Sequence, residues 1–421
     1  MEKKLILITN YFPFYKGEEY LESEINYLAN IFEEIYIIPT MINNKMNVTR
    51  ALPQNAKLIN LKSPQNKKSK VLNLIKNSRE VLFNIKNLKK VTRGTKFNIY
   101  KIVYNLYIET RTIEIYKKLL ALQKLPNNTS KDHIYIYSYW FYVTANLAIK
   151  IKNDFYNDQN ITVISRGHGY DINDYLKPFN FLPLREALLD GVDKLFTVSN
   201  QSKIYLKNKF PTYSNKIEMR RLGVQKSFKS EKINDLKIIV SCSTIRKLKR
   251  LDIIIDALAK INDCNFKWIH IGDGESYEKI SSYAKEKLAG DQFQFIGRLE
   301  NNEVLNFYKE TSPHCFINMS DSEGVPVSIM EAMAYSIPVI ASNVGGTKEI
   351  VNNNNGFLID DYKNTDLVAS KIKQLLTMDK EHYLMLKNNA YNTWKNEWDA
   401  SLVYNNFAND FINMFNRESG E

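Results

Sequence analysis

A chain of 421 residues with 44% hydrophobic side chains is long enough to form two domains that each bury a core. Its three cysteines (Cys242, Cys264 and Cys315) exclude a disulfide framework, lack the CxxC spacing of a zinc site and fit a reduced, cytosolic setting. The formal net charge of +12 favours an anionic partner such as phosphates, an acidic membrane face or nucleic acid.

The opening sequence MEKKLILITNYFP has charges followed by only a short apolar run, which fits a first buried strand better than a signal peptide. The sequence contains no run of about 18 uncharged apolar residues, so no transmembrane helix is predicted. Helical patterns, such as the one at 19–31, separate further short apolar runs. Alternating strands and helices predict a parallel sheet covered on both faces. The predicted strands are residues 4–9, 33–40, 133–139, 160–166 and 194–199.

A basic segment at 57–130 interrupts this series and is predicted to be a helical insertion. From Lys57 to Lys101 it holds 13 lysines and arginines and one acid, Glu80, with apolar residues at helical spacing. One interpretation is an ordinary helix pair with a solvated basic face. A second is attachment to an anionic membrane surface. Binding to nucleic acid has the least support, because no nucleic-acid motif accompanies the charge, and we expect none.

A second series of strands begins near residue 236 and predicts a second doubly wound α/β domain. The segment GVQKSFKSEKIND (223–235) is polar and aperiodic and marks the boundary. The tail at 398–415 has an amphipathic helical pattern that suits packing on the N-terminal half. The predicted organisation is a first domain at 1–225, a second at 226–395 and a returning helix at 396–421. The predicted strands of the second domain are 236–243, 266–272, 293–297, 315–320, 337–342 and 356–360.

The stretch SDSEGVPVSIMEAMAYSIPVIASNVGGTKEI (320–350) carries the clearest chemistry. A strand ends near Ser320, and a helix is predicted to start at Pro326 or Val327, because proline is favoured in a first helical turn. The free N–H groups of Val325, Val327 and Ser328, with the helix dipole behind them, predict an anion site.

Three further residues complete the predicted site around this helix. Gly324 lets a ligand approach the backbone closely. Glu331 lies one to two turns into the helix, and each of its carboxylate oxygens can accept a bond from a hydroxyl of a ribose. Glu323 lies on the loop, closer to a sugar attached to the phosphate. The alternative for both glutamates is a capping or solvated carboxylate.

The same stretch resembles the signature of retaining family 4 glycosyltransferases, whose two-glutamate EX7E pattern falls on Glu323 and Glu331. The resemblance covers nearly the whole chain. It implies the GT-B fold, with two Rossmann-like domains that face a cleft and a C-terminal helix that crosses back. It also implies a nucleotide diphospho-sugar, with a UDP-sugar favoured, on the C-terminal domain and a glycan or lipid-linked acceptor mainly on the N-terminal domain.

The segment SCSTIRKLKR (241–250) matches the family segment that normally reads Gly-Arg and then Lys-Gly. Lys249 falls on the diphosphate-binding lysine. Thr244 stands where the family has arginine, so Arg246 or Arg250 is expected to supply the missing charge. By the same register, IGDGE places Gly272 in the turn that faces the nucleotide, and the loop at 295–304 contacts the base through the backbone of Arg298 and Leu299.

The N-terminal half supplies the remaining predicted site residues. Gly17 gives a flexible loop near the sugar, and Glu18 either contacts the acceptor or caps the following helix. The match of SRGHGYDINDY (165–175) places His168 near the donor sugar as a hydrogen-bond donor, with Asp171 orienting it or binding the acceptor. Trp140 either contacts an acceptor sugar or packs in the core.

The resemblance implies transfer of a sugar with retention of its anomeric configuration. Lys249 and the helix N-terminus at 325–328 would stabilise the leaving diphosphate, so neither a metal ion nor a cofactor is expected. Bacterial capsule, lipopolysaccharide or related synthesis, in the cytoplasm or on the inner face of the plasma membrane, is the expected setting. The alternatives are a non-catalytic partner subunit, which the Thr244 departure favours, and a nucleotide-sugar epimerase. A phosphorylase lacks its lysine motif, and a dehydrogenase lacks GxGxxG after the first strand.

Overall fold

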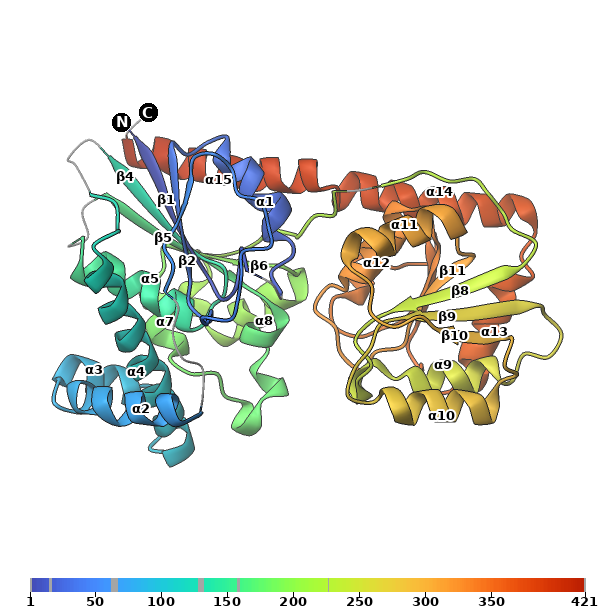
Figure 1. Cartoon of the computed structure of the whole chain (residues 1–421), viewed down its shortest axis with the longest axis horizontal. Helices are drawn as coiled ribbons and strands as arrows, with labels where there is room; N and C mark the ends of the chain where they lie inside the picture. The colour runs from blue at the N-terminus through green and yellow to red at the C-terminus, as the bar shows by residue number, and fades with distance from the viewer. Residues whose placement is uncertain are drawn as a thin grey trace. The chain divides into compact units, whose positions relative to one another are not determined.

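The computed structural model of the chain describes residues 2–14, 17–61, 67–127, 132–156, 160–225 and 227–419. The predicted insertion at 62–66 and 128–130, residue 226 at the predicted boundary and the last two residues of the predicted tail lie outside the described residues. The chain divides into two compact units, Met1–Arg221 with Tyr404–Glu421, and Leu222–Val403. Each unit is built on one parallel sheet with helices on both faces, as the alternating pattern predicted (Figure 1).

The first unit contains a seven-stranded sheet in the order β3-β2-β1-β4-β5-β6-β7, in which every pair of neighbours is parallel. The reversal of strand order beside β1 and β4 brings the loops after these strands together. The strands are β1 (Lys3–Thr9), β2 (Glu34–Pro39), β3 (Ala56–Leu58), β4 (His133–Ser138), β5 (Ile161–Gly167), β6 (Lys194–Thr197) and β7 (Ile217–Met219).

Alternation of side chains along these strands divides the core of the first unit into two layers. Ile6, Ile8 and Ile136 face one layer, and Leu5 and Leu7 face the other. The first layer holds α4 (Ile99–Leu122), α5 (Val143–Asp154), α7 (Arg185–Gly191) and α8 (Asn200–Lys209). The second holds α1 (Leu21–Ala29) and the part of α15 (Ala400–Ser419) that carries Phe407 and Phe411.

The basic insertion forms α2 (Lys67–Leu82), α3 (Ile85–Thr92) and most of α4. Figure 1 shows α2 and α3 grouped around α4, away from the strands of the first sheet. Buried Val81, Val91 and Ile113 hold the three helices together. The predicted start of the insertion at residue 57 is wrong, because Lys57 belongs to β3 and pairs in register with Tyr36 of β2. The short apolar content of AKL gives no strand signal of its own.

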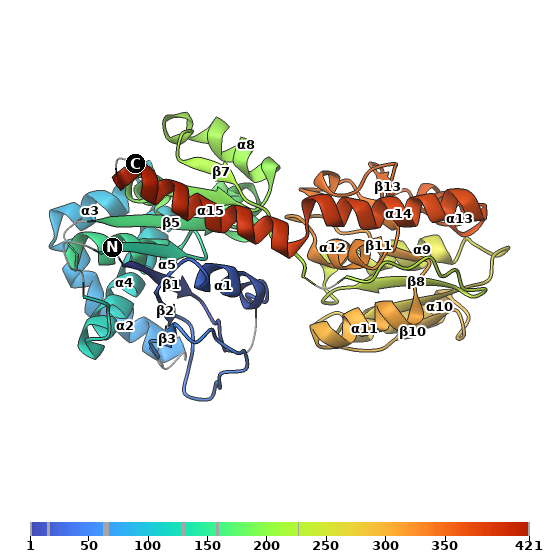
Figure 2. The same cartoon turned by 90° about the horizontal axis from the view of Figure 1, so that it is seen from above.

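The second unit contains a six-stranded parallel sheet in the order β10-β9-β8-β11-β12-β13. Trp268 and Ile317 face one core layer, and Val240 and Phe316 face the other. The strands are β8 (Lys237–Cys242), β9 (Phe266–Ile271), β10 (Phe293–Phe295), β11 (Cys315–Asn318), β12 (Val339–Ser342) and β13 (Gly356–Ile359). The helices are α9 (Leu251–Leu258), α10 (Tyr277–Lys287), α11 (Asn301–Thr311), α12 (Val327–Ala334), α13 (Thr365–Leu376) and α14 (Lys380–Glu397), which Figure 2 shows from above.

The described part of the chain contains no helix that combines the length and the apolar character needed to cross a bilayer.

A buried ion pair lies in the second core layer of the first unit. Glu24 of α1 and Arg166 of β5 are both fully buried, with Oε2 and Nη1 2.8 Å apart. Tyr137 donates a hydrogen bond of 2.8 Å to Oε1 of Glu24. The guanidinium carbon of Arg166 lies 4.4 Å from the centre of the Phe407 ring of α15. The guanidinium of Arg166 therefore links α1, the central strand β5 and α15.

Removal of one partner of this pair leaves a buried charge without compensation. We expect Glu24→Gln to lower the free energy of unfolding of the first unit by about 3–5 kcal/mol, measured by urea denaturation. The double variant Glu24→Leu/Arg166→Met should recover most of this loss, because it removes both charges. Exposed Glu22→Gln is the matched control. Equal effects of Glu24→Gln and Glu22→Gln would show that the pair contributes nothing.

Candidate functional site

The loops after β8 and β11 bring two of the predicted residues into contact in the second unit. Lys249 ends a 3-10 turn (Lys247–Lys249) after β8, and Glu323 lies in the loop between β11 and α12. The ammonium Nζ of Lys249 lies 2.6 Å from Oε1 of Glu323, and Nδ2 of Asn318 donates to the same oxygen at 3.3 Å. The backbone N–H of Asp321 donates to the carbonyl of Leu248 at 2.9 Å, so the two loops are also joined through their main chains.

A glycine pair after β12 fixes the backbone that carries Glu323. The N–H of Gly346 donates to the carbonyl of Gly324 at 2.7 Å. Gly345 has φ +57°, and a Cβ atom there would lie 1.8 Å from the carbonyl oxygen of Glu323. Only glycine fits this position, because any side chain would overlap the neighbouring backbone.

Helix α12 begins immediately after this loop, with Pro326 as its N-cap. Its first residue, Val327, is the later of the two predicted starts. The first turn contains no acidic residue. Glu331 lies in the second turn, and its Oε1 accepts a hydrogen bond of 2.6 Å from Nδ2 of Asn301, the first residue of α11. The helix N-terminus therefore presents a partial positive charge beside Gly324 and Val325, with no side-chain charge in its own first turn to oppose it.

The cations of the 241–250 segment have different surroundings. Arg250 is held by two carboxylates, with Nη2 2.9 Å from Asp252 and Nη1 3.1 Å from Asp321. Arg246 is exposed and forms no ion pair with any residue that the structure describes. Thr244 is also exposed and carries no charge. Of the two arginines considered for the missing charge, Arg246 is the one with an available guanidinium.

The turn after β9 approaches the loop after β10. Gly272 has φ +145° and donates its N–H to the carbonyl of Gly297 at 2.8 Å. A Cβ atom on Gly272 would lie 1.9 Å from the carbonyl of Ser243, so the turn also touches the β8 loop. Arg298 and Leu299 follow Gly297 directly. The predicted residues of the nucleotide site thus lie at the carboxyl ends of neighbouring strands, where doubly wound sheets bind ligands.

In the first unit, the loop after β5 carries His168 and Asp171. Nε2 of His168 lies 3.1 Å from the carbonyl oxygen of Tyr139, and its ring centre lies 4.4 Å from that of Trp140. Burial, together with the charge of Arg166, lowers the pKa of His168 to about 3, so the ring is neutral at physiological pH. A carbonyl only accepts, so Nε2 carries the proton, and the His168 side chain also accepts the N–H of Asp171 in a capping box. The predicted hydrogen bond from His168 to a sugar stays a prediction.

The carboxylate of Asp171 binds backbone rather than the imidazole ring. Oδ1 accepts from the N–H of His168 at 2.6 Å, and Oδ2 accepts from the N–H of Phe141 at 2.5 Å. Burial raises the pKa of Asp171 to about 7, despite the opposing charge of Arg185 and the two N–H groups. The predicted orientation of His168 by Asp171 is thus correct for the main chain and wrong for the ring.

Glu18 is buried and its carboxylate turns into the protein. Its two oxygens accept the N–H groups of Asn10, Tyr11 and Phe12 at 2.6–2.8 Å, and Nε1 of Trp140 at 2.6 Å. The alternative that Glu18 caps α1 with its side chain is wrong, because the N-cap is Tyr20 and has no side-chain bond. Gly17, with φ +69°, precedes Glu18 and is exposed.

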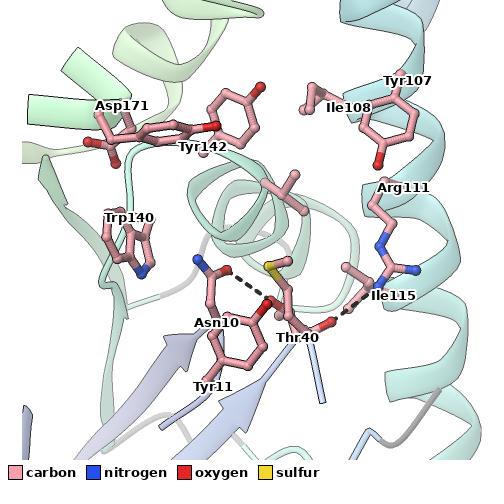
Figure 3. Close-up of a pocket in the computed structure, with 13 residues that line it drawn as sticks. Asn10, Tyr11, Thr40, Tyr107, Ile108, Arg111, Ile115, Trp140, Tyr142 and Asp171 are labelled. Carbon is pink, nitrogen blue, oxygen red and sulfur yellow. Dashed lines mark hydrogen bonds between the residues drawn. The ribbon is translucent and has the colours of Figure 1, made fainter. Parts of the chain in front are cut away.

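A cavity of about 330 Å³ opens beside these loops, within the range of small-molecule sites (Figure 3). The ends of β1 and β2, the loop after β4 and helix α4 form its walls. Nη2 of Arg111 donates to the carbonyl of Thr40 at 3.2 Å, and Oγ1 of Thr40 lies 3.4 Å from Oδ1 of Asn10. Its lining residues are Asn10, Tyr11, Thr40, Met41, Tyr107, Ile108, Arg111, Ile115, Trp140, Tyr142, Val143, Tyr170 and Asp171.

Of the residues predicted to contact an acceptor, Trp140 and Asp171 line this cavity and Glu18 does not. Tyr107 and Arg111 of α4 were not predicted. Their i, i+4 spacing places them on one face of a helix, which is a usable signal. The basic charge of the segment around them directed the interpretation to the outer surface instead.

Residues 224–393 match the family model described as glycosyl transferases group 1. An uncharacterized glycosyltransferase of Methanocaldococcus jannaschii is 33% identical over 37% of this chain, a match that spans only 42% of that relative. N-acetyl-alpha-D-glucosaminyl L-malate synthase of Bacillus anthracis is 23% identical over 73% of this chain and 85% of its own length.

Two solved structures are similar over almost the whole chain. The apo form of the lipopolysaccharide outer core galactosyltransferase WaaB superposes with a TM-score of 0.68 at 15% identity, covering 98% of this chain and 99% of that one. Anabaena HepE in complex with UDP and glucose superposes with a TM-score of 0.61 at 13% identity, covering 98% and 100%. These neighbours have the GT-B fold. Residues 224–393 are thus similar to the glycosyltransferase group 1 family, in a chain whose two Rossmann-like domains have the GT-B fold.

Proposed function

We propose that the protein is a retaining, metal-independent glycosyltransferase that moves a sugar from a nucleotide diphospho-sugar to a glycan or lipid-linked acceptor in bacterial cell-surface polysaccharide synthesis. The observation that carries the proposal is the contact of Lys249 with Glu323 beside the N-terminus of α12. A UDP-sugar is the favoured substrate, supported by UDP in the similar HepE structure. The name of WaaB supports a surface glycan as product.

The diphosphate of this substrate would bind where positive charge is gathered. Lys249, exposed Arg246 and the first N–H groups of α12 supply a mobile ammonium, a guanidinium and a helix dipole. Lys249 is already paired with Glu323, so a diphosphate competes with that carboxylate for the ammonium. When Lys249 moves to phosphate, Glu323 is released to accept hydroxyl groups of the sugar. Substrate binding thereby prepares both residues.

The nucleoside would extend along α12 and the neighbouring loops. Glu331 would accept the ribose hydroxyls in place of the amide of Asn301, which now occupies one of its oxygens. The backbone of Arg298 and Leu299, joined to the β9 turn through Gly297 and Gly272, would contact the base. Each of these groups lies at the carboxyl ends of β8 to β11, where a nucleotide suits a doubly wound sheet.

The chemical step follows from where charge develops. As the bond between sugar and phosphate breaks, negative charge grows on the diphosphate, and Lys249 with the α12 N-terminus stabilises it. The acceptor hydroxyl attacks from the same face, and its proton passes to the departing phosphate oxygen, which conserves the anomeric configuration. Glu323 would position the sugar, and neutral His168 would form a hydrogen bond with one of its hydroxyl groups.

The cavity of the first unit is the proposed acceptor site. Its walls combine the rings of Tyr11, Trp140 and Tyr142 with the polar groups of Asn10 and Arg111, and aromatic faces with a few polar groups suit a sugar ring. Association with the inner face of the plasma membrane belongs to the same proposal, because surface glycans are often assembled on lipid carriers.

The role of Lys249 predicts a large loss of turnover on Lys249→Met, on the order of 100- to 1000-fold, because one charge that stabilises the leaving group is removed. Turnover is measured as release of the nucleoside diphosphate from a panel of nucleotide sugars. Lys247→Met removes a neighbouring exposed charge and is the matched control.

The assay in EDTA tests the metal-independent part of the proposal, and turnover restored only by a divalent ion would contradict it. Equal losses in the Lys249 and Lys247 variants would contradict the role of Lys249. A wild-type protein that releases no nucleoside diphosphate from any substrate of the panel would favour a non-catalytic subunit. Conversion of the nucleotide sugar without an acceptor would favour an epimerase.

Arg246 and Arg250 should respond differently to substitution. Arg246→Ala is expected to weaken UDP binding about tenfold, the loss of roughly one charge-assisted bond, with no change in thermal stability. Arg250→Ala is expected to lower the melting temperature, because Asp252 and Asp321 lose their shared partner. Calorimetric titration with UDP measures the loss of binding, and thermal melts measure the loss of stability, in the Arg246 and Arg250 variants. The reverse pattern would assign to Arg250 the charge that is missing at Thr244.

The raised pKa of Asp171 predicts that the free energy of unfolding depends on pH. The proposed acceptor site, which Asp171 lines, would share this dependence. Its pKa in the fold is about 7, above the ordinary aspartate value, so the folded state favours the protonated form. The contribution of Asp171 to the free energy of unfolding therefore falls as pH rises from about 4 to 7. Between pH 5 and pH 7.5 the wild type should lose about 2 kcal/mol more than Asp171→Asn, measured by urea denaturation. Parallel pH profiles would contradict the raised pKa.

A further inference from the structure

The tripeptide Phe-Asn-Ile occurs twice in the basic insertion, at residues 83–85 and 97–99, and each copy opens a helix. Asn84 caps α3 by accepting the N–H of Asn87 at 3.2 Å, and Asn98 caps α4 by accepting the N–H of Lys101 at 3.2 Å. In both copies phenylalanine therefore precedes the N-cap, and isoleucine is the first helical residue.

A hydrophobic residue before an N-cap usually packs against its own helix. Here Phe83 is 87% exposed and Phe97 is 88% exposed, while Ile85 and Ile99 are 72% and 78% exposed. The small core of the insertion uses other residues, so these four do not stabilise it. Further apolar side chains on the same three helices are also exposed, namely Ile75, Leu82, Leu88, Tyr100 and Val103. We term these side chains, taken together with the phenylalanines and isoleucines of the two Phe-Asn-Ile copies, the insertion face; they share exposure and the three helices of the insertion.

The backbone that presents Phe97 is strained. Lys96 and Phe97 have φ of +49° and +59°, in the left-handed region that bulky residues rarely adopt. Strain of this kind persists where the surrounding structure imposes it, and it is concentrated at functional positions. An exposed phenylalanine with a strained backbone is a poor choice for a surface that contacts only water.

The charges around the insertion face are positive and separate into two groups. Lys90 and Arg93 pair with carboxylates, at 2.8 Å to Glu109 of α4 and 2.9 Å to Glu186 of α7. A second group is exposed and, among the described residues, forms no ion pair; its members are Lys76, Arg79, Lys86, Lys89 and Lys96. Glu80, the one acidic residue between Lys57 and Lys101, pairs with Lys117.

We propose that the insertion face docks on an anionic lipid bilayer. Exposed aromatic and aliphatic side chains among lysines and arginines match the boundary between acyl chains and acidic headgroups. The same charges oppose a second copy of the chain, because two insertion faces would bring like charges together. A nucleic acid would use the charges but not the exposed phenylalanines and isoleucines.

Helix α4 connects this face with the cavity. Ile99 and Val103 lie on the insertion face, and Tyr107 and Arg111 line the cavity further along the same helix. From Ile99 to Arg111 the helix rises about 18 Å, at 1.5 Å per residue. A docked protein would hold the cavity on the same helix that carries part of the lipid contact, which suits an acceptor head group carried by a lipid. The docking deepens the membrane association of the proposed function, and only the link to the cavity needs sugar transfer.

The experiment is flotation of the full chain with vesicles of phosphatidylcholine alone and of phosphatidylcholine mixed equally with phosphatidylglycerol. The wild type is expected to float with the anionic vesicles only, and to be released by high salt. Phe83→Ser/Phe97→Ser should abolish flotation. Lys86→Gln/Lys89→Gln/Lys96→Gln should weaken binding roughly fivefold per lysine, on the order of 100-fold in total.

Matched controls use exposed residues elsewhere. Ile204→Ser replaces a 49% exposed isoleucine of α8, and Lys279→Gln/Lys285→Gln removes exposed charges from α10; both should float like the wild type. Circular dichroism checks that all variants are folded. Absence of the wild type from anionic vesicles, or unchanged flotation of the phenylalanine variant, would overturn the proposal. Self-association that the phenylalanine variant abolishes, without vesicle binding, would overturn it in favour of a second copy. Neither result depends on sugar transfer.

Discussion

The candidate site of the second unit depends on one contact between main chains, in which the N–H of Gly346 meets the carbonyl of Gly324. This contact holds the loop after β12 against the loop after β11, and a second backbone bond, from Asp321 to Leu248, adds the loop after β8. Lys249 and Glu323 therefore meet on main chains that are already fixed. Because peptide groups do not titrate, these two backbone contacts do not themselves depend on the charge state of the side chains that the loops carry.

In the first unit, a side chain rather than a contact between glycines fixes a loop at the candidate site. The loop after β1 is shaped by a side chain, Glu18, whose carboxylate collects three successive N–H groups and the indole of Trp140. Burial raises the pKa of Glu18 against the effect of these four bonds. The arrangement is therefore sensitive to protonation, unlike the glycine contact of the other unit. A titratable group thus shapes the loop after β1, whereas peptide groups make the glycine contact of the second unit, although both units present their candidate residues at the carboxyl ends of parallel strands.

The sequence predicted the fold well because parallel strands buried on both faces read as short apolar runs. It missed β3 and β7, because each of these three-residue strands has a charged residue at its centre, and it consequently started the insertion too early. Lys249 and Glu323 were predicted from their motif positions, and the structure shows them in contact. The inward turn of Glu18 and the carbonyl partner of His168 could not be predicted, because both depend on segments distant in sequence. Tyr107 and Arg111 were missed because helical spacing shows which residues share one face of a helix but not what that face packs against.

The returning helix has a consequence for how the protein forms during synthesis. The second unit is one continuous segment, Leu222–Val403, whereas the first unit includes Tyr404–Glu421 at the far end of the chain. Phe407 and Phe411 complete the core layer that contains Leu5 and Tyr137, and the ring of Phe407 covers Arg166. The half that leaves the ribosome first is thus the half that is completed last. Until α15 has been synthesised, the nascent first unit exposes the apolar face of its sheet, together with Arg166. Exposed apolar surface of this kind promotes aggregation, so the first unit needs protection from aggregation that the second unit does not need.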